Sequence, residues 1–197
     1  MSNSFSKIGT LVLASASPAR LQVLRDLGID VKACPTSTDE HHTETEPGLT
    51  VQTLARRKMD SFLRCHPLFE GNALSCDTLI WFDGKLIGKP ADEADARAQL
   101  SLFSGNTHEV FSGYCLLENG KMHSGFDKAS VVFNKLSPKQ IDDYIISGEY
   151  KGAAGSYRIQ GLASKFIERI DGDINTVIGV PVDLLGKVFS QSTSEQR

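Results

Sequence analysis

Ser15, Ser17 and Arg20 are spaced so that their side chains can converge on one anion. The segment LVLASASPAR, residues 11–20, has the pattern of a short apolar strand, a turn and the start of a helix. Ser17 followed by Pro18 is the preferred pair for a helix N-cap and first helical position. A helix N-terminus presents backbone N–H groups and a guanidinium adds charge-assisted hydrogen bonds, so the segment predicts a phosphate site. An ordinary capped strand–turn–helix unit is the alternative.

A second group of polar residues has the chemistry to act on a bound phosphate. Asp77 follows the predicted strand 73–76, and a carboxylate at the end of a strand can face a cleft. Lys89 stands between Gly88 and Pro90, which restrict the backbone around it. The other members of the group are Lys58, Asp39, Glu40 and Gln160. This group of residues suits phosphoryl transfer. The lysines can hold the phosphates, a divalent ion can bridge the acids and the phosphate oxygens, and one carboxylate can orient the attacking water. Solvated charges at loop ends are the alternative interpretation.

The elements that must position these residues alternate between strand and helix and then turn to hairpins. Amphipathic spacing predicts helices over residues 18–27, 50–65 and 92–103, and a capping box at Ser137 opens a fourth. Strands are expected at 11–14, 29–34, 73–76, 79–82, 85–87 and 166–170, with a hairpin of 108–117 and 123–133 and a final helix from Pro181. The pattern predicts an α/β fold with a mixed, twisted central sheet and flanking helices.

Composition excludes several classes of protein. The 197 residues are 40% hydrophobic and 23% charged, as in an ordinary globular protein. A formal net charge of −3 provides no electrostatic footprint for duplex nucleic acid. Apolar runs are too short for a bilayer, and the N-terminus lacks the pattern of a secretory signal. We therefore expect a cytoplasmic protein with no membrane or duplex nucleic-acid partner.

Other patterns narrow the chemistry further. The four cysteines form no C-x-x-C pair and are predicted to be reduced and mostly buried, namely Cys34, Cys65, Cys76 and Cys115. The pair His41-His42 lies in an acidic stretch and is interpreted as part of a solvated loop rather than a metal site. The sequence contains no GxxxxGK[ST], GxGxxG, GxSxG or HExxH motif, which argues against P-loop, dinucleotide, serine-hydrolase and zincin chemistry.

Eight motifs, taken in order along the chain, resemble those of the Maf family. They are LASASPAR, STDE, LARRK, CDT, GKP, SGNTHEV, AAGSYRIQG and NTVIGVPV. The resemblance covers residues 11–185 and implies a fold related to that of inosine triphosphate pyrophosphatase. It also implies a single Maf-like domain over residues 1–197, with an ordered core at about 9–190 and an active-site cleft between two lobes.

The family resemblance implies a nucleoside triphosphate pyrophosphatase, which is a nucleoside triphosphate diphosphatase acting on phosphorus-containing anhydrides. Such an enzyme hydrolyses the bond between the α and β phosphates to give a monophosphate and pyrophosphate, and removes unwanted nucleotides from the pool. Family members use a divalent metal cation, Mg²⁺ or Mn²⁺, and form homodimers. A cell-division (septum) inhibitor that acts through protein contacts is the alternative, and the retained acids and lysines favour catalysis.

The family's functional positions carry over residue by residue. Asp77 matches the proton acceptor that deprotonates the attacking water, and Asp77 and Glu40 match the acids that hold the metal. The phosphate-binding and substrate-binding positions are matched by Ser15, Ser17, Arg20, Lys58, Lys89 and Gln160. Thr78 and Gln160 match positions associated with the choice of base.

One position departs from the family pattern. The commonest turn is SPRR, and Ala19 stands here in place of the first arginine. Thr78 and Gln160 agree with the branch that resembles dTTP and UTP pyrophosphatases, whereas the branch acting on 7-methyl-GTP has a tryptophan at the position of Ala19. We therefore expect pyrimidine or modified nucleotides to be favoured, with broader specificity than in an SPRR enzyme.

Overall fold

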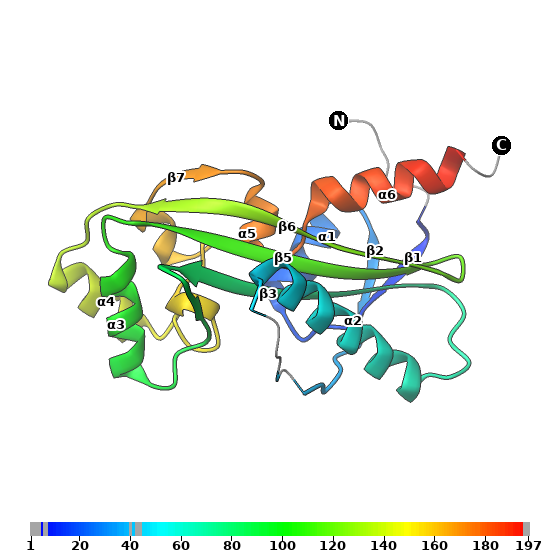
Figure 1. The fold of residues 1–197 in the computed structure, drawn as a ribbon, viewed down its shortest axis with the longest axis horizontal. Helices are drawn as coiled ribbons and strands as arrows, with labels where there is room; N and C mark the ends of the chain where they lie inside the picture. The colour runs from blue at the N-terminus through cyan, green and yellow to red at the C-terminus, as the bar shows by residue number, and fades with distance from the viewer. Residues whose placement is uncertain (1–4, 6–7, 40, 42–44, 195–197) are drawn as a thin grey trace. The chain divides into compact units, whose positions relative to one another are not determined.

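The computed structural model describes residues 5, 8–39, 41 and 45–194 (Figure 1). Its strands are β1 (Thr10–Leu13), β2 (Asp30–Ala33), β3 (Asn72–Phe82), β4 (Lys85–Ile87), β5 (Thr107–Glu118), β6 (Lys121–Phe133) and β7 (Ile167–Asp171). Its α-helices are α1 (Pro18–Asp26), α2 (Pro47–Cys65), α3 (Glu93–Phe103), α4 (Pro138–Ser147), α5 (Ile174–Ile178) and α6 (Val182–Ser194), with 3₁₀ turns η1 (Ala154–Ser156) and η2 (Leu162–Phe166).

The strands form one mixed sheet. Their order is β2-β1-β3-β5-β6-β7, and β4 pairs with β3 off this path. β1 is parallel to both β2 and β3, whereas the β3–β4 and β6–β7 pairs are antiparallel. Asn119 and Gly120 turn between β5 and β6 with positive φ angles of 48° and 76°, as a tight hairpin requires. The predicted α/β class with a mixed sheet is confirmed.

The chain divides into two compact units. Unit 1 comprises residues 1–77, 112–127 and 179–197, and unit 2 comprises residues 78–111 and 128–178. The strands β3, β5 and β6 each contribute residues to both units. Each unit has a hydrophobic core of its own, with Phe62 and Met59 in unit 1 and Phe103 and Phe166 in unit 2.

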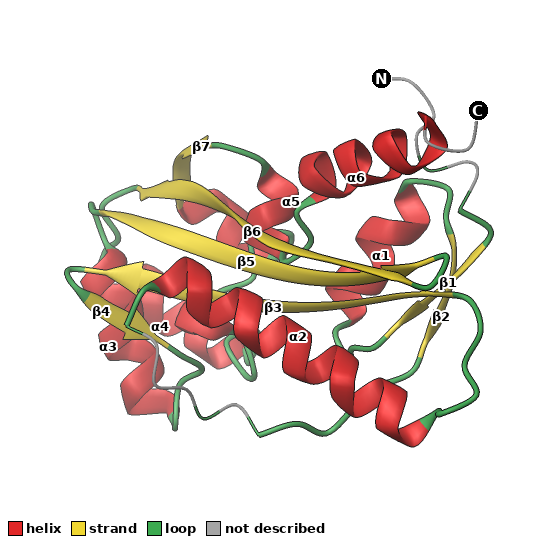
Figure 2. Cartoon of the chain, turned by 45° about the vertical axis from the view of Figure 1, so that its right-hand side comes forward, coloured by secondary structure: helices red, strands yellow, loops and turns green. Residues whose placement is uncertain are grey.

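In unit 1, α2 packs closely against the sheet (Figure 2). A Cβ atom added at Gly113 of β5 would overlap the backbone carbonyl of Val51, so only glycine allows this approach. The buried hydroxyl of Ser75 in β3 donates a hydrogen bond of 2.7 Å to the Ala55 carbonyl of α2. These two contacts determine the distance and the register of the helix relative to β3.

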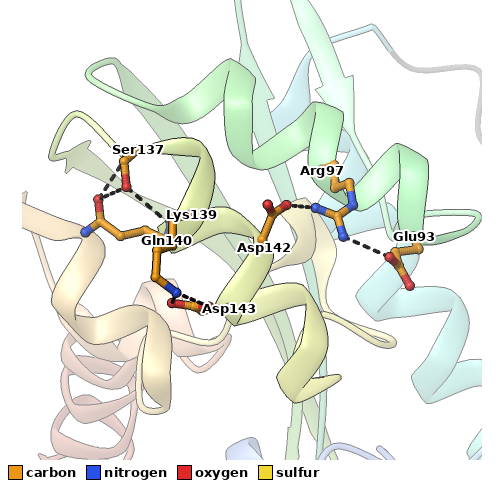
Figure 3. Close-up of polar contacts among 7 residues, drawn as sticks. All are labelled: Glu93, Arg97, Ser137, Lys139, Gln140, Asp142 and Asp143. Carbon is orange, nitrogen blue, oxygen red and sulfur yellow. Dashed lines mark hydrogen bonds and ion pairs between the residues drawn. The ribbon is translucent and has the colours of Figure 1, made fainter.

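In unit 2, polar contacts join α3 and α4 (Figure 3). Arg97 forms an ion pair with Asp142 and reaches Glu93, one turn earlier on its own helix, at 3.0 Å. The predicted capping box at the start of α4 is present: the Ser137 hydroxyl accepts from the Gln140 backbone N–H, and the Gln140 side chain accepts from the Ser137 backbone N–H.

Several sequence-based boundaries were wrong. The segments 73–76 and 79–82 form one continuous strand, so Asp77 lies inside β3 and not at its end. Helix α2 begins at Pro47, three residues before the predicted start, because proline is favoured in the first helical turn. The short helix α5 was not predicted.

The cysteine prediction is partly right. Cys76 and Cys115 are buried, but Cys34 is half-buried and Cys65 is exposed. All four are free thiols. No helix among the described residues has the length and apolarity needed to cross a membrane.

Candidate active site

The turn between β1 and α1 is organised by its own serines. The Ser15 hydroxyl accepts a hydrogen bond from the Ser17 backbone N–H at 3.2 Å. The Ser17 hydroxyl caps α1 by accepting from the Arg20 backbone N–H at 3.4 Å, which confirms the predicted N-cap. The first turn of α1 is therefore held in a fixed conformation, as an anion site at a helix N-terminus requires.

Arg20 ties this turn to β3. Its Nη1 donates to the Ser15 hydroxyl at 3.2 Å and to the Cys76 carbonyl at 2.8 Å. Since β1 and β3 are parallel neighbours, their carboxyl-terminal directions bring the turn and residue 76 to the same region of unit 1. Arg20 thus has a structural contact next to Asp77, and the phosphate-binding roles implied for Ser15, Ser17 and Arg20 stay predictions.

Asp77 and Lys58 form an ion pair inside unit 1. The Lys58 Nζ contacts Asp77 Oδ1, and the two side chains are only 14% and 8% exposed. A carboxylate buried to this degree needs a partner, because desolvation strongly disfavours an isolated charge. Lys58 lies on α2, one turn after Ala55, whose carbonyl accepts the Ser75 hydrogen bond. The packing of α2 on β3 therefore brings this pair together.

The neighbouring thiol does not compete with the carboxylate as a reactive group. Cys76 is fully buried, and burial raises the pKa of its thiol to about 11, against the smaller opposing effects of the Arg20 and Lys58 charges. A thiol with this pKa stays protonated near neutral pH. Asp77 is thus the group in this part of unit 1 with the chemistry to accept a proton from water.

The remaining predicted residues are distributed over both units. Ala19 is half-buried in the first turn of α1. Thr78 follows Asp77 in β3, and Lys89 and Gln160 are exposed residues of unit 2. The Gly155 N–H donates to the Gly88 carbonyl at 3.0 Å, so the segments that carry Lys89 and Gln160 are joined within unit 2. The cleft between two lobes stays a prediction.

The metal site predicted at Asp77 and Glu40 stays a prediction. Glu40 lies outside the described residues, and so does His42 of the acidic stretch. Within the described part of the chain, no three His, Cys, Asp or Glu residues gather into a site. Mg²⁺ is commonly held by one or two carboxylates with substrate phosphates as the other ligands, and Asp77 matches that donor set.

A buried histidine that sequence reasoning did not single out lies in unit 2. His108 is 2% exposed, its ring stacks on Phe103 at 4.2 Å, and its Nε2 lies 2.8 Å from the Tyr157 hydroxyl. Burial lowers the pKa of His108 to about 3, so the ring is neutral at physiological pH. The sequence feature that could have pointed to His108 is its place in SGNTHEV, one of the motifs that resemble the Maf family. The contact between His108 and Tyr157 holds in place the segment that leads to Gln160.

The fold and the residues of unit 1 define the class of protein. A capped strand–turn–helix of the kind that binds anions is tied to a strand that carries a lysine-paired carboxylate, on a mixed α/β sheet. This combination is the one expected of an α/β protein that acts on phosphate compounds, and the phosphate-binding roles themselves stay predictions.

Comparison with known proteins identifies the family. The family model described as "Maf-like protein" matches residues 10–192 of the sequence, and the chain belongs to the Maf family. The dTTP/UTP pyrophosphatase of Syntrophomonas wolfei is 42% identical over 174 residues, which are 86% of this chain and 90% of the relative. That of Pyrococcus abyssi is 38% identical over 176 residues, which are 89% of this chain and 92% of the relative.

One solved structure is also similar. A nucleoside-triphosphatase, dITP/XTP pyrophosphatase, from Mycobacterium abscessus is 16% identical, with a TM-score of 0.37 over 63% of this chain and 74% of that chain.

The ion pair predicts a large coupling between Lys58 and Asp77. Lys58→Met leaves a buried carboxylate without its cation, so we expect the free energy of unfolding at pH 7 to fall by about 3 kcal/mol. The double variant Lys58→Met/Asp77→Asn removes the stranded charge and recovers part of this loss. Urea unfolding measures both. Lys139→Met is the matched control, since Lys139 and Asp143 are exposed and their pair contributes at most about 0.5 kcal/mol. Equal losses in the Lys58 and Lys139 variants would contradict the assignment.

The neutral state of His108 predicts a pH-dependent stability. Below about pH 6.5 the unfolded chain protonates this histidine, while the folded protein keeps it neutral down to about pH 3. The unfolded state therefore binds more protons in this window, and stability falls as the pH falls, by up to about 1.4 kcal/mol per pH unit. Urea titrations between pH 4 and 7 should show this slope in the wild type and in Tyr157→Phe, and a shallower slope in His108→Phe. An unchanged slope in His108→Phe would refute the interpretation.

Proposed function

We propose that this protein is a nucleoside triphosphate pyrophosphatase that removes unwanted nucleotides, with dTTP and UTP as favoured substrates. The observation that carries the proposal is the buried Lys58–Asp77 pair beside the capped turn of α1. Membership of the Maf family and relatives named dTTP/UTP pyrophosphatases at 38–42% identity support the reaction and the bases. No described feature favours the alternative role in cell division.

In this reaction Asp77 accepts the proton of a water molecule, and the resulting hydroxide attacks the α-phosphorus. The bond between that phosphorus and the oxygen bridging to the β-phosphorus breaks, and pyrophosphate leaves with the bridging oxygen. Lys58 holds the Asp77 carboxylate in position, and its ammonium has three N–H donors, so it can contact the carboxylate and a phosphate oxygen together. Ser15, Ser17 and the first turn of α1 hold phosphate oxygens, and Lys89 neutralises charge on the triphosphate.

A divalent cation fits this scheme. Asp77 and Glu40, together with the substrate's own phosphates, would hold Mg²⁺ or Mn²⁺, and the ion would neutralise charge that develops on the leaving pyrophosphate. Homodimer formation and a cytoplasmic location belong to the same proposal, through the family resemblance.

The test of the reaction is pyrophosphate release from a panel of nucleoside triphosphates with Mg²⁺ or Mn²⁺. We expect activity with dTTP and UTP, and a loss of kcat of about 100-fold or more in Asp77→Asn, because the amide cannot accept a proton. Lys89→Ala should lower kcat/KM. Thermal unfolding checks that each variant is folded. A folded Asp77→Asn variant with wild-type turnover would exclude Asp77 as the base.

Ala19, in the turn before α1, leads to a separate prediction about the preference among bases. Arg20 is engaged by Ser15 and Cys76, so residue 19 is the position of the turn from which another guanidinium can reach a ligand. A hydrogen bond to a charged group is worth about 1.5–3 kcal/mol, so Ala19→Arg should raise kcat/KM for dTTP or UTP relative to purine triphosphates about tenfold or more. Ala19→Gln, which adds length without charge, is the matched control. Unchanged relative kcat/KM values in Ala19→Arg would contradict this role for residue 19.

A further inference from the structure

Gln160 lies at the tip of a tight turn in unit 2. The Gly161 N–H donates to the Arg158 carbonyl at 3.0 Å, so Ile159 and Gln160 are the two central residues of the turn. The Ile159 side chain is buried and that of Gln160 is exposed. One side chain thus anchors the turn while the other is presented to the outside.

The residue that follows the turn is held by Glu149. The Leu162 backbone N–H donates to both carboxylate oxygens of Glu149, at 2.9 and 3.1 Å. A Cβ atom at Gly161 would lie 2.5 Å from the same oxygens, so the carboxylate approaches this closely only because residue 161 is glycine. Hydrogen bonds to a charged acceptor are stronger than those between neutral groups.

The residue that precedes the central pair is held by the same segment. The Arg158 guanidinium donates to the Glu149 carbonyl at 3.1 Å through Nε and to the Lys151 carbonyl at 2.7 Å through Nη2. The Arg158 backbone N–H donates to the Tyr144 hydroxyl at 3.2 Å. Burial is the main effect that raises the pKa of Tyr144 to about 12, so this hydroxyl stays neutral.

Buried contacts fix the chain on the N-terminal side as well. The Ser156 hydroxyl donates to Gln99 of α3 at 2.6 Å, and Tyr157 pairs with His108. Glu149 contacts both sides of the turn: its backbone carbonyl accepts from Arg158 and its carboxylate accepts from the Leu162 N–H. A substitution of Glu149 removes the carboxylate contact and loosens the Leu162 side of the turn, while the backbone carbonyl and the buried contacts keep the rest of the segment in place.

We propose that Glu149 is a positioning residue for base selection: it fixes the turn that presents Gln160 to the nucleoside base. This inference rests on the proposed function, in which Gln160 contacts the base. Glu149 itself touches no substrate. Its effect is to limit the orientations of Gln160, so that the amide donates and accepts hydrogen bonds in one arrangement and discriminates between bases.

The test compares dTTP with dGTP in steady-state kinetics. Glu149→Ala should lower the ratio of the two kcat/KM values about tenfold, mainly through a higher KM for dTTP, with kcat within about twofold of the wild type. Glu149→Gln keeps an oxygen that accepts from the Leu162 N–H and should recover most of the ratio. Glu168→Ala removes an exposed acid of β7 in the same unit and should match the wild type. Thermal unfolding identifies any variant that is not folded.

A double-mutant cycle separates positioning from general loosening of unit 2. If Glu149 acts through Gln160, Glu149→Ala has no further effect on the ratio in a Gln160→Ala background. Should Glu149→Ala fail to fold, the same cycle is run with Glu149→Ser, whose short side chain cannot reach the Leu162 N–H. An unchanged ratio in the folded Glu149→Ala or Glu149→Ser variant, or an effect that adds to that of Gln160→Ala, would overturn the inference and leave the proposed function intact. A wild-type protein that releases no pyrophosphate from either nucleotide overturns both.

Discussion

The burial of a carboxylate inside β3 is the constraint on which unit 1 depends. Asp77 follows four fully buried residues in a continuous strand, and its own exposed fraction is 6%. A charge at such a position is tolerated only beside an opposite charge. Lys58 supplies that charge from α2, which can come close enough because Gly113 has no side chain. The hydrogen bond from Ser75 to α2 then sets the position of the helix along the strand.

The capped turn of α1 is joined to this pair through one side chain. Arg20 donates to the turn and to the carbonyl that precedes Asp77, so one guanidinium joins the turn to the strand that carries the carboxylate. Arg20, for which the family resemblance implies a phosphate-binding role, therefore also stabilises the fold. In unit 2, polar side chains also stabilise the backbone: Glu149 and Arg158 form hydrogen bonds with backbone groups on either side of a turn, at which Gln160 is exposed.

Local sequence signals predicted the elements that depend on local physics. The Ser17-Pro18 cap, the capping box at Ser137 and the Asn119-Gly120 hairpin turn all occur as predicted, because each depends on hydrogen bonds or dihedral angles within a few residues. The predictions that were wrong depended on distant contacts. A polar residue at position 77 suggested the end of a strand, since the partner that allows it to be buried is 19 residues away on α2.

The amino-acid sequence by itself determined the fold class, the capped turn and, through eight ordered motifs, the family, because these depend on short-range patterns and on the order of residue types. Only the tertiary structure decided which polar groups meet. It paired Lys58 with Asp77, joined Arg20 to the Cys76 carbonyl and brought the Glu149 carboxylate to the Leu162 N–H beside the turn of Gln160. The physical reason is that a buried charge or a backbone N–H is satisfied by whichever partner the packing brings within about 3 Å, and packing is a property of the whole chain.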